Sequence, residues 1–105
     1  MELMLKRIHV HGSRGTIGEL WYGDQLLCWT LEKSSPSCLP AGVYQVGCGL
    51  FHAGNRVDDI HKDCVLVGMS CSLATSNIFE CNAALRSIKR LIGSTLFTIR
   101  VVDVK

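Results

Sequence analysis

The chain has 105 residues, of which 48% are hydrophobic and 19% are charged, and its formal net charge is +2 at pH 7. This length fits one domain spanning residues 1–105, and the composition supports a packed core and excludes a largely disordered chain. The small net charge, with basic residues that do not interleave with aromatic ones, predicts no nucleic-acid partner.

The first residues lack the basic start and long apolar run of a signal peptide. No apolar stretch approaches the roughly 20 residues that a helix needs to span a bilayer. The sequence therefore predicts a protein without a membrane span that is made in the cytoplasm. On this interpretation, the protein reaches a virion or the cell envelope only after release.

Six cysteines are spread along the chain: Cys28, Cys38, Cys48, Cys64, Cys71 and Cys81. An even count in a short chain is typical of a disulfide framework. The missing export signal and the high apolar content instead favour reduced and mostly buried thiols. No CxxC pair is present, and the spacings do not match structural zinc sites. We therefore expect no native disulfide and no cofactor.

The first half of the chain is predicted to form strands, over Glu2–Val10, Thr16–Tyr22, Gln25–Glu32 and Val43–Val46. Gly23 occupies the first central position between the second and third strands, which suits a type II′ hairpin turn. His9 and His11 fall on one face of the first strand, a spacing that can bind a metal. An exposed strand end is the favoured interpretation, because no third ligand lies nearby.

The second half is predicted to add a loop over His52–Asp63, a buried strand over Cys64–Val67, a polar linker over Ser70–Ser76, a helix and a final strand over Thr95–Val102. Asn77 with Glu80 predicts a capping box at the helix start, and Gly93 a natural stop. The expected apolar stripe is Ile78, Cys81, Leu85, Ile88 and Leu91 or Ile92. This layout predicts a mainly β (α+β) fold, a small barrel or curled antiparallel or mixed sheet with one helix.

Reactive side chains concentrate between residues 51 and 68. Cysteine is a strong nucleophile when a neighbour removes its proton, and histidine is the usual base. Cys64 is the candidate nucleophile, and His52 and His61 are the candidate bases. Gly54 and nearby backbone amides could form an oxyanion hole. The groups that could orient the base are Asn55, Asp58, Asp59 and Asp63.

Two alternatives stay open on the residues alone. A cysteine at the start of a strand commonly packs in a core, and a histidine in a loop is commonly solvated. A zinc site fits by ligand type, although its spacing is irregular. Its ligands would be His52, His61, Cys64 and Cys71.

The order of several motifs resembles an uncharacterised domain family of bacteriophages and bacteria. These motifs are Thr16–Leu20, Cys28–Glu32, Leu39–Tyr44, His52–Asn55, Asp59 and Cys64–Gly68. That family is similar to L,D-transpeptidase-type cysteine enzymes, which attack peptidoglycan stem peptides. The resemblance implies that Cys64 is the nucleophile and that His52 and Gly54 form a His-x-Gly-like element. It also implies that Tyr44, of a Pro-x-Gly-x-aromatic turn, lies on the substrate side with Gly54 and Asn55.

The chain departs from both families around the cysteine. Asp63 stands where glycine is usual and places a negative charge beside the thiol, His61 lies three rather than two residues before Cys64, and Val65 replaces an arginine. Two functions follow. The first is a small phage-type cysteine enzyme that acts on peptide or peptidoglycan amide bonds by acyl transfer, with Asp59 orienting the base. The second is a non-catalytic binding or structural module, such as a virion component or host inhibitor, with a protein partner.

Overall fold

The computed structural model describes residues 1–34, 38–60 and 64–103. Within them the strands are β1 Glu2–Val10, β2 Thr16–Tyr22, β3 Gln25–Glu32, β4 Gly42–Val46, β5 Phe51–His52, β6 Val65–Gly68, β7 Ser70–Ser72, β8 Asn77–Phe79 and β9 Phe97–Val102. The helices are α1 Cys81–Ile92 and the 3-10 turns η1 Gly12–Arg14, η2 Cys48–Leu50 and η3 Val57–Asp59. The predicted mainly β class, with one helix in the C-terminal half, is confirmed.

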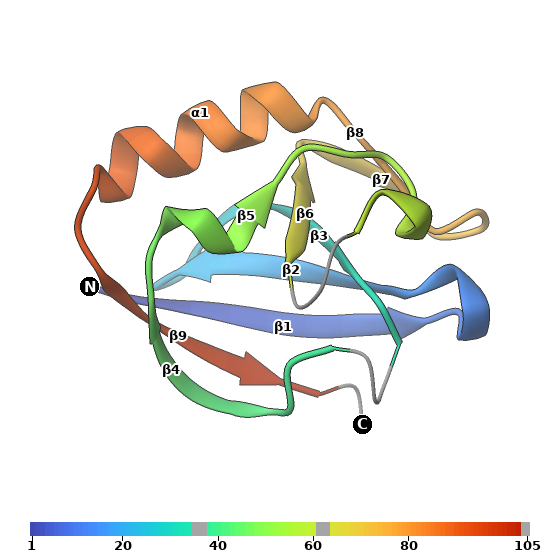
Figure 1. The fold of residues 1–105 in the computed structure, drawn as a ribbon, viewed down its shortest axis with the longest axis horizontal. Coiled ribbons are helices and arrows are strands. Elements are labelled where there is room, and N and C mark those ends of the chain that lie inside the picture. The colour runs from blue at the N-terminus through green and yellow to red at the C-terminus, as the bar shows by residue number, and fades with distance from the viewer. Residues whose placement is uncertain (35–37, 61–63, 104–105) are drawn as a thin grey trace.

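Seven strands form one curled sheet in the order β4-β9-β1-β2-β3-β6-β5 (Figure 1). The β1–β9 and β5–β6 pairs are parallel, and the others are antiparallel, so the sheet is mixed. β7 and β8 form a separate hairpin, and α1 crosses over β6, β3 and β5. The helix therefore covers the part of the sheet from which the candidate loop emerges.

Buried and exposed side chains alternate along the strands, which gives the sheet an apolar inner face. In β1, Leu3 and Leu5 are buried while Met4 is exposed, as expected for a strand that packs on one side. The inward residues meet the buried side of α1, where Ala84, Ile88 and Ile92 recur at four-residue steps. The ring of Phe51 stacks on Phe97 at a centroid distance of 5.9 Å, which fixes β5 against β9 across the core.

β6 is buried on both faces, which explains its uninterrupted apolar sequence. Val65 and Val67 face the main core, while Leu66 belongs to a second cluster with residues from β2, β3 and β8. The second cluster also contains Ile60, so the segment after η3 packs directly against the sheet. The loop that carries the candidate site thus rests on a rigid strand.

The predicted helix start is wrong. Asn77 does not cap α1 but pairs with Ser72 in the β7–β8 hairpin, so residues 70–76 are not simply a polar linker. The helix begins at Cys81 after Glu80, which has a left-handed φ of +61° and no side-chain cap bond. Ile78 is buried, but on β8, where its backbone N–H and C=O groups bond to Asn55 instead of forming part of a helical turn.

Other local predictions agree with the structure. The hairpin turn has Gly23 at φ +61°, while Asp24 is not among the residues with positive φ, as a type II′ turn requires. The final strand buries Phe97, Ile99 and Val101 on one face. Of the helices in the described part of the chain, none has the length and apolar character to cross a membrane.

Candidate active site

The predicted base, His52, lies on β5, and the predicted nucleophile, Cys64, directly precedes the neighbouring strand β6. The two strands pair in parallel, with Phe51 opposite Val65 and His52 opposite Leu66. Phe51 and Val65 are buried in the main core, so the alternation of strand side chains directs His52 to the other face. Cys64 is half-buried and directly precedes β6, and extending the alternation by one residue assigns it to the face of Leu66 and His52.

A backbone carbonyl holds the ring of His52. Its Nε2 lies 2.8 Å from the carbonyl oxygen of Gly49, three residues earlier, and the side chain is exposed. A carbonyl can only accept a hydrogen bond, so Nε2 carries the proton when His52 is neutral. Nδ1 is then unprotonated, which is the state that a general base requires.

Asp59 and Asn55 build the loop that follows His52. Oδ2 of Asp59 accepts hydrogen bonds from the backbone N–H groups of Asn55, at 2.9 Å, and Arg56, at 3.2 Å. The Asn55 side chain donates to the carbonyl of Ile78 at 2.8 Å, and the Ile78 N–H donates back to Asn55 O at 2.9 Å. The N–H of Asn55 is therefore engaged within the loop, and the orienting group on His52 is Gly49.

Glycine is required at position 54 because the backbone there closely approaches Asp59 and Leu66. A Cβ at this position would lie 2.8 Å from Cβ of Asp59 and 2.9 Å from Cδ1 of Leu66. Real Cβ atoms do not approach other carbons so closely, so any side chain would push the loop away from β6. The predicted Gly54 thus has a structural role in holding the loop after His52 against β6.

The loop encloses an open hollow of about 510 Å³, here called the His52 hollow, lined by His52, Ala53, Gly54, Asn55, Asp58, Asp59 and Cys81. Five predicted site residues meet here: His52, Gly54, Asn55, Asp58 and Asp59. Cys64 does not line it, whereas Cys81 does, at the first position of α1. The sequence pattern predicted packing for Cys81, because its three- and four-residue spacing to Leu85 and Ile88 suited a buried helix face.

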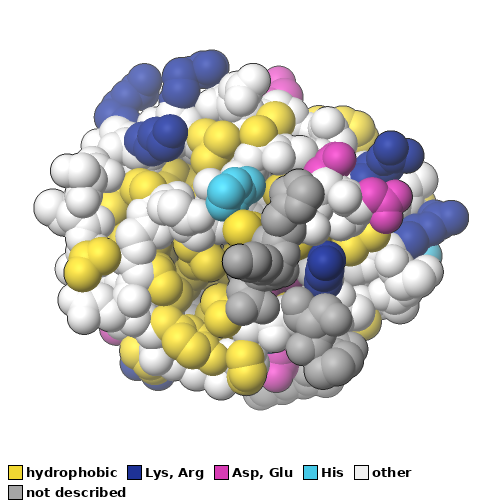
Figure 2. All heavy atoms as spheres, viewed as in Figure 1, with side chains coloured by type: hydrophobic (Ala, Val, Ile, Leu, Met, Phe, Trp, Pro, Cys, Tyr) yellow, Lys and Arg dark blue, Asp and Glu magenta, His cyan; other side chains and the backbone are white. Residues whose placement is uncertain are grey.

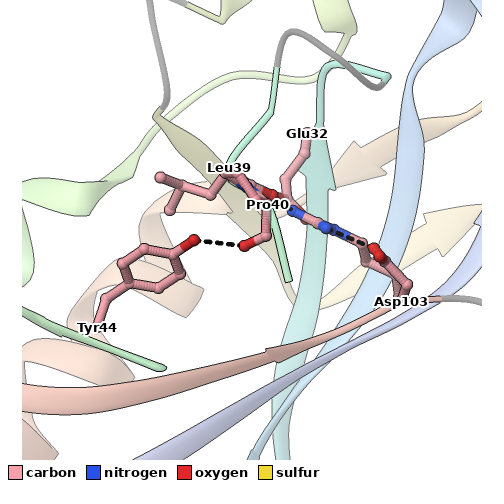
Figure 3. A network of polar contacts seen from close by, with 6 residues as sticks. Glu32, Leu39, Pro40, Tyr44 and Asp103 are labelled. Atoms are coloured by element: carbon pink, nitrogen blue, oxygen red, sulfur yellow. Dashed lines mark hydrogen bonds and ion pairs between the residues drawn. The ribbon is translucent and has the colours of Figure 1, made fainter. Parts of the chain in front are cut away.

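Tyr44 lies apart from this hollow. Its hydroxyl donates to the carbonyl of Pro40 at 2.6 Å, so it braces the Pro-containing turn before β4 (Figure 3). Its ring packs against the main core and not among the residues of the His52 hollow. His61, the second predicted base, and Asp63 lie outside the described residues.

A buried charge network, which the sequence analysis missed, joins β1 and β3. Arg7 donates from Nε and Nη2 to the two carboxylate oxygens of Glu32, at 3.0 and 2.8 Å. Nη1 binds Asp103 at 2.7 Å, and Nη2 also reaches the carbonyl of Leu39 at 2.6 Å (Figure 3). Burial alone would lower the pKa of Arg7, but its hydrogen bonds to Glu32 and the charge of that carboxylate raise it above the ordinary value. The only hint in the sequence was that both charged residues stand at inward positions of strands.

Metal-binding arrangements are absent from the described part of the chain, where no three His, Cys, Asp or Glu side chains are grouped for an ion. His9 and His11 do share a face, with ring centroids 5.7 Å apart. Cys71 lies on β7 against the second cluster, and burial, with the charge of Glu19, raises the pKa of its thiol. All six cysteines are free.

Comparisons with known proteins found no relative of this chain. No family model, no curated protein and no solved structure matches this chain.

Proposed function

We propose that this protein is a small cysteine enzyme that acts on peptide amide bonds by acyl transfer, with Cys64 as nucleophile and His52 as base. The observation that carries the proposal is the 2.8 Å contact from His52 Nε2 to the Gly49 carbonyl. It leaves Nδ1 unprotonated on the strand beside the one that Cys64 precedes. A base oriented by a third group, next to a thiol, is the arrangement that covalent catalysis needs.

The reaction follows from these roles. His52 Nδ1 takes the proton of the Cys64 thiol, and the thiolate attacks the carbonyl carbon of the substrate amide. The carbon–nitrogen bond breaks, and the imidazolium returns its proton to the leaving amine. The resulting thioester is resolved by water or by a second amine, with His52 again acting as base. Gly49 keeps the ring in one orientation through both steps.

The acidic lining of the His52 hollow favours a cationic substrate group. Asp58 and Asp59 both border it, and no Lys or Arg is among its described lining residues. An ammonium group of a peptide would gain attraction from these carboxylates. A peptidoglycan stem peptide containing a diamino acid fits this requirement, and it is the substrate class that the motif resemblance implies.

One observation favours the second function, a binding or structural module without turnover. Cys64 is half-buried and does not line the His52 hollow. A protein that used the acidic hollow only to hold a partner's cationic group would need no thiol there. The two functions therefore differ in what Cys64 does.

The test is incubation of the protein with purified stem peptides, followed by mass spectrometry of products and of intact protein. The proposal predicts a cleaved or transferred peptide and an acyl adduct on Cys64. Cys64→Ala should abolish both, while Cys38→Ala, a half-buried cysteine outside the His52 hollow, should retain them. Peptide binding without product or adduct would favour the binding module instead.

A further inference from the structure

A second hollow, of about 340 Å³, is formed where three segments distant in the sequence meet. We call it the Arg14–Arg56 hollow, and its lining residues are Arg14, Arg56, Val57, Asp58, Thr75, Ser76 and Asn77. These residues come from the β1–β2 turn, the start of η3 and the β7–β8 turn, which Figure 1 places at the same end of the molecule. Only Asp58 is shared with the His52 hollow.

The three segments are tied together, so the hollow is preformed. A Cβ on Gly15 would lie 3.2 Å from Cγ2 of Val57, which shows that the β1–β2 turn packs directly on η3. The paired bonds between Asn55 and Ile78, at 2.8 and 2.9 Å, join the loop before η3 to β8. Ligand sites that are already assembled bind without the cost of ordering their walls.

The described lining of this hollow carries more positive than negative charge. Arg14 and Arg56 are exposed, and neither forms an ion pair with any residue that the structure describes. Asp58 is the one carboxylate in the described lining, so two positive charges face one negative charge. Figure 2 shows basic and acidic side chains gathered at this end of the molecule, on the right of the view. Two unpaired guanidinium groups at one hollow favour an anionic ligand.

Ser76 supplies an independent indication. It is 1% exposed, and its hydroxyl has no hydrogen-bond partner within the described residues. Its φ is +55°, in the left-handed region, which glycine adopts without strain and serine does not. A strained backbone and an unsatisfied buried hydroxyl both disfavour the folded state, and such features concentrate at functional sites.

We infer that the Arg14–Arg56 hollow binds an oxyanion, the carboxylate or phosphate group of a small ligand. The guanidinium of Arg56 or Arg14 would donate paired N–H groups to two oxygens, and the Ser76 hydroxyl would donate to one of them. Thr75 and Asn77 add further polar groups in the lining. This site is separate from the proposed chemistry, because none of the proposed catalytic groups, Cys64, His52 and Gly49, belongs to it.

The experiment is a titration of ¹⁵N-labelled protein with inorganic phosphate and, separately, with acetate, with chloride adjusted to hold ionic strength constant. The inference predicts saturable shifts in the backbone amides of residues 55–58 and 75–77. Saturation by phosphate alone identifies a phosphate ligand, and saturation by acetate alone identifies a carboxylate. Shifts that stay linear, or that match the chloride control, for both anions would overturn the inference.

Variants separate this site from general charge attraction. Arg56→Gln should weaken binding about tenfold, the typical effect of losing a charged hydrogen bond. Ser76→Gly should also weaken binding, although it relieves the backbone strain, so loss of affinity without loss of thermal stability is expected. The matched control is Arg86→Gln, an exposed α1 residue outside the hollow, which should bind like the parent protein. An equal loss in Arg86→Gln and Arg56→Gln would contradict a defined site.

Discussion

Arg7 and Glu32 face each other inside the curled sheet through two parallel hydrogen bonds, from Nε to Oε1 at 3.0 Å and from Nη2 to Oε2 at 2.8 Å. Both side chains are almost fully buried, at 4% and 2% exposure. Asp103 and the Leu39 carbonyl occupy further donors of the guanidinium, so the N-terminal strand, β3 and the end of the chain meet at one charged group. Desolvation opposes burying such a pair, and the full set of hydrogen bonds offsets it.

Replacing one partner of this pair should lower the free energy of unfolding more than replacing both. We expect Arg7→Met or Glu32→Leu alone to lower the free energy of unfolding by about 3–5 kcal/mol, because the first leaves buried Glu32 without its cation and the second leaves buried Arg7 with only the exposed carboxylate of Asp103. The double variant should recover most of that loss. Urea unfolding of the four proteins measures the coupling, and strictly additive losses would contradict it.

The exposed pair between Arg100 and Glu2 is the matched control. Its atoms lie 3.2 Å apart, and both side chains are about half exposed, at 47% and 50%. Solvent screening makes such pairs weak, so Arg100→Gln should change the free energy of unfolding by no more than about 1 kcal/mol.

Cys28 should make stability fall at alkaline pH. Burial raises the pKa of its thiol to about 12 from an ordinary value of 9.0. The unfolded chain therefore loses this proton first, so the contribution of Cys28 is complete below pH 9 and is lost as pH rises from 9 toward 12. The slope is at most about 1.4 kcal/mol per pH unit.

Comparison with Cys28→Ala isolates this effect from other titrating groups. The variant lacks the buried thiol, so its deficit in unfolding free energy should shrink between pH 8 and pH 10.5. Urea unfolding at several pH values gives the difference directly. A deficit that stays constant over this range would show that the thiol does not carry the effect.

Because only one side of α1 is buried, alanine substitutions along the helix should lower the free energy of unfolding by unequal amounts. Ile88 is 1% exposed, so Ile88→Ala should cost about 2–5 kcal/mol through lost burial and a cavity. Leu85 is only half-buried, so Leu85→Ala should cost clearly less, although the sequence pattern placed both on the same core stripe. Thermal or urea unfolding distinguishes them, and equal costs would contradict the observed rotation of the helix.

Gly54 and Gly49 form a matched pair for testing the loop. Gly54→Ala would place a Cβ 2.8 Å from Asp59 Cβ, so we expect a loss of about 1–3 kcal/mol and displacement of the His52 loop. Gly49→Ala meets no heavy atom within 4 Å and should change stability by no more than about 0.5 kcal/mol. Amide chemical shifts of residues 52–59 report the displacement, and an unperturbed loop in Gly54→Ala would refute the close approach.

The strands could be predicted from sequence because apolar alternation and turn residues agree with the final structure. β1, β2 and β3 have the predicted bounds, and Gly23 provides the predicted turn. The helix start could not be predicted, because Asn77 and Glu80 offer a local cap. Instead Asn77 pairs with Ser72 in a hairpin, and Asn55, 23 residues earlier, bonds to the backbone of Ile78. Local capping signals do not include such tertiary competition.

The candidate site was predictable in its residue types but not in its contacts. The motif around His52 and Gly54 indicated the loop, and the structure brings both to one hollow. Gly49 could not be identified as the orienting group, because its role depends on a backbone carbonyl and no side chain marks it. The same holds for Cys81 and for the Arg7–Glu32 pair, whose partners lie far apart in the sequence.

The central claim, that His52 activates Cys64, is tested most directly by the labelling rate of each cysteine. Native protein is pulsed with iodoacetamide from pH 5 to pH 9, quenched and mapped by peptide mass, first as the parent protein and then as His52→Gln. The proposal predicts that Cys64 labels fastest of the six thiols, and that His52→Gln slows Cys64 while leaving Cys81 unchanged. Labelling of Cys64 no faster than that of Cys28 or Cys81, and unaffected by His52→Gln, would contradict it.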